Sequence, residues 1–222
     1  MNIIEAIKAR SSIRAFLSKP IPTEILQSIL ELSSLAPSGK NTQPWHVAVV
    51  TGETQHKISE ALLQAFHNKE KPYPDYQYYP QPLPPSFEKR AFECGKVLYS
   101  ALQVDRHDEA KRLEQWSKNY HFFGAPACFL VFLDKFATEG SFLDAGMFMQ
   151  NIMLAALDFN LGTCPQASLA GYPDRVKNIL GEPFKNKLLI AGISIGYPDE
   201  GHPVNQYRTA RESVDSFVKL YS

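Results

Sequence analysis

The sequence has few cysteines and no excess of either charge. Its three cysteines, Cys94, Cys128 and Cys164, lie far apart without a Cys-Xaa-Xaa-Cys pair, which argues against a disulfide framework or a zinc knuckle and favours a reducing compartment. Lys plus Arg and Asp plus Glu number 23 each, so the net charge predicts neither a nucleic-acid partner nor attraction to an anionic membrane. Any anion site must therefore be local.

Long apolar runs, metal-ligand spacings and a dinucleotide fingerprint are also missing. No apolar run approaches the roughly 18 residues of a membrane span, and the first turns carry Glu5, Lys8 and Arg10 rather than a signal-peptide core. The six histidines show no metal-ligand spacing, and no Gly-rich turn follows a predicted strand. We expect a soluble cytoplasmic protein that holds no metal.

The composition is that of an ordinary globular protein, with 44% hydrophobic and 21% charged residues. The 222 residues allow one large domain or two small ones, and we favour a single domain, 1–222. Periodicity predicts strands at 45–52, 126–134 and 187–198 and helices at 2–8, 21–36, 53–66, 86–102, 108–123, 141–160 and 172–181.

Three further segments have a distinctive pattern. The helix at 141–160 is apolar on most faces, which indicates a buried central helix, with Gly162 just past its end. The segment 71–85 holds six prolines and four tyrosines and is either a surface excursion or an aromatic lid over a pocket. The tail, 207–222, buries little on its own chain, and we expect it to pack across a subunit surface.

A cluster of two arginines and two serines follows the first helix. Arg10 favours a helix C-terminus, so capping is one interpretation of the cluster. Capping leaves Ser11, Ser12 and Arg14 without a role. Two guanidinium groups, two hydroxyls and the N–H groups of the turn form a plausible cradle for a phosphate dianion.

Two polar connections offer further candidate sites. The stretch 37–44 is either simple turn chemistry or, through Ser38, Asn41 and Gln43, a set of donors and acceptors for a heterocycle or a ribityl chain. The stretch 162–168 is either a connector or a place where Pro165 and its backbone approach a flat ligand. Nothing near Cys164 in the sequence marks it as an activated nucleophile.

The order and spacing of four segments resemble those of the flavin-dependent nitroreductase family. These segments are residues 10–14, 35–52, 144–157 and 192–211. The segment 71–85, "CPQAS" at 164–168 and "PVNQYR" at 203–208 resemble the nitrobenzoate-reductase branch of that family.

The resemblance implies an α+β fold, with a mixed sheet flanked by helices in an intertwined homodimer whose C-terminal arms are exchanged. It also implies FMN as cofactor, NADH or NADPH as reductant, and a nitroaromatic or quinone-type acceptor reduced by ping-pong hydride transfer. The cofactor carries the chemistry, so we expect no catalytic side chain. There are two alternatives to this function. One is another flavin reductase on the same fold (an enone or azo reductase or a dehalogenase), and the other is a non-catalytic flavin-binding protein.

The resemblance also assigns cofactor-binding residues. It implies that the FMN phosphate and ribityl chain are held by Arg10, Ser11, Ser12 and Arg14, and that the phosphate is also contacted by Arg208. It implies that the flavin is reached from the other subunit by Pro37, Ser38, Asn41 and Gln43. The isoalloxazine is expected to face Pro165, Gln166 and Ala167. Many relatives have Glu-Gly where Gln166 and Ala167 stand, and many carry a second C-terminal cation. Here that second contact is expected to be Asn205 or absent.

Overall fold

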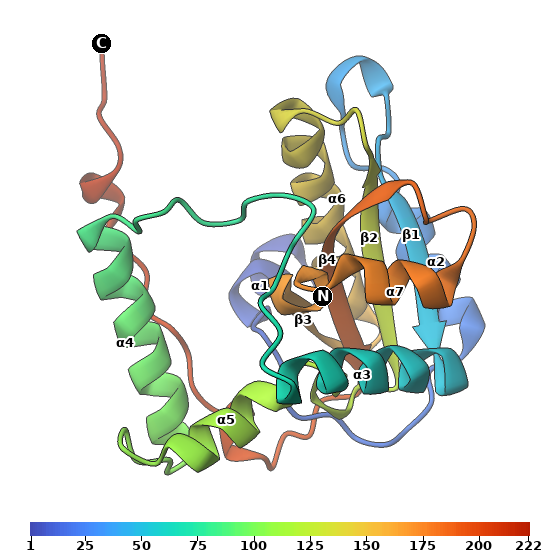
Figure 1. Ribbon diagram of the computed structural model, residues 1–222. Coiled ribbons are helices and arrows are strands. Elements are labelled where there is room, and N and C mark those ends of the chain that lie inside the picture. Colours follow the sequence, from blue (N-terminus) through green and yellow to red (C-terminus); the bar gives the residue numbers. More distant parts are fainter.

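The computed structural model describes all residues, 1–222. It contains α-helices and strands along the whole chain, and the expected α+β class is confirmed (Figure 1). The helices are α1 (Ile3–Ala9), α2 (Thr23–Ser33), α3 (Gly52–His67), α4 (Pro85–Ala101), α5 (Glu109–Ser117), α6 (Glu139–Asp158) and α7 (Pro173–Leu180), and the strands are β1 (His46–Thr51), β2 (Ala127–Asp134), β3 (Gly162–Gln166) and β4 (Lys187–Gly196).

The four strands form one sheet in the order β1-β2-β4-β3, and neighbouring strands are antiparallel. The sheet of one chain is thus antiparallel and not mixed as expected, and the parallel contact is an isolated bridge between Ser12 and Thr163, outside the pairing of the four strands. The backbone N–H of Ile13 donates to the carbonyl of Thr163 at 2.9 Å. The segment after α1 is therefore held against β3, which joins the first and third candidate sites of the sequence.

The core lies on both faces of the sheet. Strand β2 is buried along most of its length, with Phe129 and Val131 on the face covered by α2 and α6, and Cys128 and Leu130 on the face covered by α3 and α7 (Figure 1). A strand that is covered on both faces needs a continuous apolar run, and this one has it.

Helix α6 buries one side against the sheet and exposes apolar residues on another, where Leu143 is 72% and Met147 39% exposed in the single chain. The expected role of Gly162 as the residue that ends this helix is wrong. The left-handed residue after α6 is Asn160 (φ 57°), and Gly162 begins β3. A Cβ on Gly162 would lie 2.5 Å from Cγ1 of Ile13, so close packing requires the glycine.

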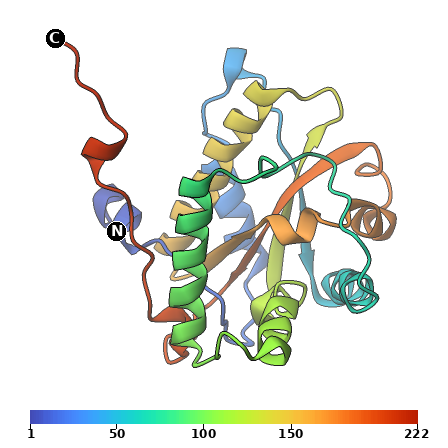
Figure 2. The same cartoon turned by 60° about the vertical axis from the view of Figure 1, so that its left-hand side comes forward.

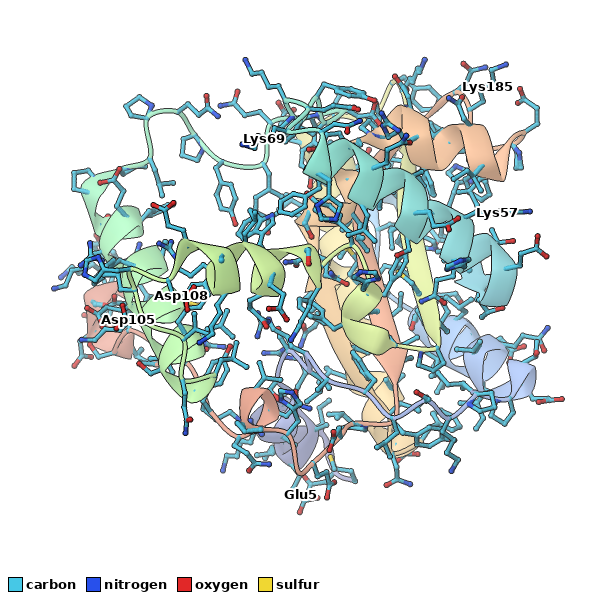
Figure 3. All side chains as sticks on the ribbon, turned by 60° about the horizontal axis from the view of Figure 1, so that its bottom comes forward. Glu5, Lys57, Lys69, Asp105, Asp108 and Lys185 are labelled. Carbon is cyan, nitrogen blue, oxygen red and sulfur yellow. The ribbon has the colours of Figure 1, made fainter.

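Helices α4 and α5 and the tail lie to one side of the sheet (Figure 2). The predicted helix 108–123 ends early, at Ser117, and Asp108 caps its start by accepting from the N–H of Lys111 at 3.0 Å. Figure 3 shows Asp105 and Asp108 at the turn between α4 and α5, at the outer edge of the molecule. Among the helices, none is both long and apolar enough to cross a bilayer.

The tail runs beside α4, where Arg90 pairs with Glu212 at 3.4 Å, and then leaves the molecule (Figures 1 and 2). Its apolar residues Val214, Phe217 and Leu220 are exposed. Packing of this arm on another subunit stays a prediction.

Candidate functional site

Asn205 fixes the arginine- and serine-rich segment after α1. Its side-chain oxygen accepts from the N–H of Arg14 at 2.8 Å, and its amide group donates to the carbonyls of Ala15 and Asp199, both at 2.8 Å. Both donors of this buried amide are therefore used inside the protein. Asn205 positions the segment and has no N–H left for the phosphate contact that we considered for it.

Three arginines from the two ends of the chain gather at the C-terminal end of α6. Burial, together with the charges of Arg211 and Arg208, lowers the pKa of Arg10. None of the three forms an ion pair with a carboxylate. Arg10 and Arg208 line a cavity of about 510 Å³, together with Ser11, Thr163 and one acidic residue, Glu200. Arginines that have no ion-pair partner and border a cavity are an arrangement expected of an anion site.

Sequence reasoning missed Arg211. The signal was present, because Arg208 and Arg211 stand three residues apart in "QYRTAR". The charge of Arg211, like that of Arg208, lowers the pKa of Arg10, so Arg211 is a candidate for the second C-terminal cation.

Arg14 lies beside a different cavity from Arg10. Its guanidinium donates to the hydroxyl of Tyr207 at 2.9 Å. It lines a cavity of about 720 Å³, together with Pro165, Gln166 and Ala167. Arg14 therefore faces the second cavity, although it is only four residues from Arg10 in the chain. Cys164 is buried, and burial raises the pKa of its thiol to about 11, so the thiol is protonated and not an activated nucleophile.

The segment Pro165–Ala167 is a wall shared by two cavities with aromatic linings. The first is the 720 Å³ cavity, and the second, of about 420 Å³, lies toward α6 and β4. The aromatic residues that line one or both are Tyr76, Tyr78, Tyr79, Tyr99, Trp116, Tyr120, Phe123 and Phe142. Flat aromatic side chains around a backbone wall suit a flat, conjugated ligand.

The side chain of Gln166 is turned into the protein. Its amide donates to the carbonyl of Asn119 at 2.9 Å and accepts from the hydroxyl of the buried Ser194. It therefore stabilises the wall, and its amide group is used inside the protein and not presented to a ligand. Sequence reasoning did not find this network, because its partners lie 47 and 28 residues away.

The turn 37–43 lies at the opposite end of α6. The N–H of Gly39 donates to Asp144 at 3.2 Å, whereas the cationic cavity is lined by Leu157. These two positions are separated by 13 residues, or about 20 Å of helix. A single chain therefore does not bring Pro37, Ser38, Asn41 and Gln43 to the other predicted site residues.

The backbone of the turn 37–43 is nevertheless held in strained conformations. Lys40, Asn41 and Gln43 have positive φ angles of 52°, 58° and 47°, and the hydroxyl of Ser38 accepts from the N–H of Gln43 at 2.9 Å. Left-handed backbone at non-glycine residues persists only where it is held, and it clusters at functional sites.

Comparison with known proteins decides the family. Residues 7–197 match the Nitroreductase family. The chain belongs to this family. It is 36% identical over 212 residues to the 4-nitrobenzoate reductase of Pseudomonas putida, covering 96% of this chain and 92% of that protein. It is 35% identical over 215 residues to the nitroreductase NfnB of Mycolicibacterium smegmatis, covering 96% and 90%. The resemblance to the nitrobenzoate-reductase branch is confirmed.

Solved structures of the same family confirm the fold. The FMN and NADPH-dependent nitroreductase NfnB from Sphigopyxis sp. strain HMH superposes with a TM-score of 0.95 at 33% identity, covering 100% of both chains. The FMN-dependent nitroreductase NfnB from Mycobacterium smegmatis, in complex with NADPH, gives a TM-score of 0.92 at 32% identity with the same coverage.

Proposed function

We propose that this nitroreductase-family protein is an FMN-dependent NAD(P)H oxidoreductase that reduces nitroaromatic or quinone-type compounds by a ping-pong mechanism. The observation that carries this proposal is the cluster of arginines without an ion-pair partner, on a segment that continues to a cavity with a backbone wall and an aromatic lining. Relatives described as 4-nitrobenzoate reductase and as FMN and NADPH-dependent nitroreductase support it.

The residues fit both ends of FMN. Arg10, Arg208 and Arg211 supply cationic donors for the phosphate, and Ser11 and Ser12 supply neutral ones on the same segment. Arg14 lines the same cavity as Pro165, Gln166 and Ala167, which are the residues proposed to hold the flavin ring system. FMN held by these residues would supply the redox chemistry between NADH or NADPH and the acceptor.

The protein's own share is binding, orientation and exclusion of water. The Gln166 amide network holds the wall, and the tyrosines of the segment 71–85 cover the cavity in which reductant and acceptor take turns. No side-chain acid or base is assigned. Arg14 sits where it would favour negative charge on a bound ligand.

We further propose that the working form is a homodimer in the cytoplasm. The turn 37–43 and the cationic cavity lie at opposite ends of α6, so a second chain in the reverse orientation would bring one turn to each cavity. The exposed apolar side chains of α6 and α1 and the uncovered arm give such a partner a surface to bury. The three cysteines are free, as a reducing compartment requires.

The visible spectrum of the purified protein tests the proposal. We expect an oxidised-flavin spectrum that bleaches under nitrogen with NADH or NADPH and returns when 4-nitrobenzoate or menadione is added. A colourless protein that ignores added FMN would contradict the proposal. A flavin spectrum that neither reductant bleaches would favour a non-catalytic flavin-binding protein instead.

A further inference from the structure

A buried ion pair ties the proline- and tyrosine-rich segment to the body of the protein. The ammonium group of Lys177, on α7, lies 3.0 and 3.1 Å from the two carboxylate oxygens of Asp75. The side chain of Lys177 is 5% exposed and that of Asp75 16%. The carboxylate also accepts from the N–H of Leu189, on β4, at 2.9 Å. Asp75 thus joins its segment to α7 and β4 at once.

Burial makes this contact costly to break. Two charges removed from water are tolerated only where each is paired and hydrogen-bonded, and removal of one partner leaves the other without compensation. Here Lys177 has only weaker further partners, the carbonyl of Lys187 at 3.4 Å and the exposed carboxylate of Asp174 at 3.5 Å. The pair therefore holds Asp75 in one place more firmly than an exposed ion pair would.

The neighbouring residue in the chain, Tyr76, lines both aromatic cavities. Its hydroxyl donates to the carbonyl of Ile190 at 2.7 Å, and its ring lies 5.0 Å from that of Phe142. Because the hydroxyl is used by the protein, Tyr76 offers a ligand its ring. Three residues earlier, the N–H of Tyr73 donates to the carbonyl of Gly171 at 2.9 Å.

The second half of the segment lacks such contacts. Tyr78 and Tyr79 are 57% and 60% exposed, and the amide of Gln77 bonds only to the carbonyl of Tyr79 within the same stretch. Figure 1 shows the segment rising along the body from the end of α3 and then crossing to α4. The two halves therefore differ in how firmly they are held.

We propose that the Asp75–Lys177 pair is the positioning element that makes Tyr76 a fixed wall of the acceptor site, and that adjustment to different acceptors is confined to residues 77–84. The part that concerns acceptors rests on the proposed function. Asp75 and Lys177 are positioning residues, which act through Tyr76 and touch no substrate themselves.

The test compares Asp75→Ala, the double variant Asp75→Ala/Lys177→Met and a matched control, Glu70→Gln. The control breaks the neighbouring ion pair of Glu70 with Arg175 (2.6 and 2.8 Å), which is more exposed and lies before the anchored residues. The first measurement is limited chymotrypsin digestion with mass spectrometry. In the wild type and the control we expect cleavage after Tyr78 but not after Tyr76, and in both Asp75 variants cleavage after both.

The second measurement is steady-state reduction of 4-nitrobenzoate by the FMN-loaded enzyme. We expect KM for the acceptor to rise about tenfold in both Asp75 variants, as for a lost packing wall, with kcat within about twofold of the wild type. The control should keep the wild-type KM.

The double variant separates positioning from stability, because it carries no uncompensated buried charge. If it regains thermal stability and also the wild-type KM and cleavage pattern, the pair is merely structural and the proposal is overturned. Persistence of both changes supports it. If Asp75→Ala fails to fold, the double variant alone tests whether the pair positions Tyr76. If the protein binds no FMN, the proposed function is wrong, but the digestion still tests whether the Asp75–Lys177 pair holds Tyr76 in place.

Discussion

The two ends of α6 carry the two halves of the candidate site in different states of completeness. At the C-terminal end, Arg10 and Arg208 line a cavity that one chain builds alone, and Arg211 lies close enough to act on the charge of Arg10. At the N-terminal end, the strained turn 37–43 presents polar groups but lines neither the cationic cavity nor either of the two aromatic cavities of its own chain. The first half is thus formed by the folding of one chain, whereas the second half would contact a cofactor only in the proposed homodimer.

This difference separates two contributions to cofactor affinity. Phosphate affinity should depend on the fold of one chain, whereas contacts to the ring system should depend on association. Variants that act on association, on the cationic cavity and on the turn should therefore weaken FMN binding to different extents and for different reasons.

The largest effect is expected from charges placed on the exposed apolar face of α6. Leu143→Glu/Met147→Glu would bury two carboxylates in the proposed interface, so we expect a monomer that binds FMN on the order of a hundredfold more weakly. Light scattering on a sizing column gives the mass, and FMN fluorescence titration the affinity. Leu113→Glu, on the exposed face of α5, is the control. A folded monomer with full FMN affinity would refute the split site.

Removal of single arginines should come next. Arg10→Ala deletes a charge-assisted contact to phosphate, which costs about 1.5–3 kcal/mol, or roughly tenfold to a hundredfold in FMN affinity. Arg14→Ala should cost less, because Arg14 lies beside the wall and not in the cationic cavity. Arg106→Ala, at the outer turn, serves as the control. If Arg14→Ala releases FMN and Arg10→Ala does not, the phosphate assignment is reversed.

Periodicity and turn residues predicted most of the fold, because strands such as β2 and helices such as α6 carry their pattern locally. The prediction failed where tertiary contacts override it. Helix α5 ends before Phe122 and Phe123, which are buried and have positive φ angles of 54°. No local sequence pattern predicts this left-handed backbone conformation. Gly162 was predicted to end a helix. A glycine is needed there for another reason, because the side chain of Ile13, distant in the chain, leaves no room for a Cβ.

The candidate site was predictable as a set of segments but not as a geometry. The resemblance named the segments, and the bridge between Ser12 and Thr163 shows that two of them meet. The proximity of Arg211 to Arg10 depends on the path of the C-terminal segment, and the inward turn of Gln166 depends on Asn119 and Ser194. These are contacts between residues distant in the chain, which spacing alone does not reveal.

A smaller effect is expected from the turn. Asn41→Ala removes one side chain that is proposed to reach the flavin of the partner chain, so FMN affinity should fall by about threefold to tenfold, the value of one hydrogen bond. Complementation sharpens the test. In a heterodimer of an Asn41→Ala chain with an Arg10→Ala chain, one site carries both changes and the other carries neither. Titration of the heterodimer should then show half of the sites with wild-type affinity. Two weakened sites, one with the affinity of each single variant, would instead mean that Asn41 and Arg10 of the same chain serve the same site.

The smallest effect concerns the reactivity of the Cys164 thiol, which lies beside the cationic cavity. Its alkylation rate shows whether the protein is closed at the C-terminal end of α6 before any ligand binds. Burial raises the pKa of its thiol to about 11 even though Arg14 and Arg10 act in the opposite direction. The thiol therefore stays protonated, and unreactive toward iodoacetamide, at pH values well below 11. The exposed Cys94 provides the internal control. At pH 8 without FMN, mass spectrometry should find Cys94 alkylated and Cys164 unmodified. Alkylation of Cys164 at a comparable rate would mean that the cationic end opens in the free protein, and the two ends of α6 would then not differ in preorganisation.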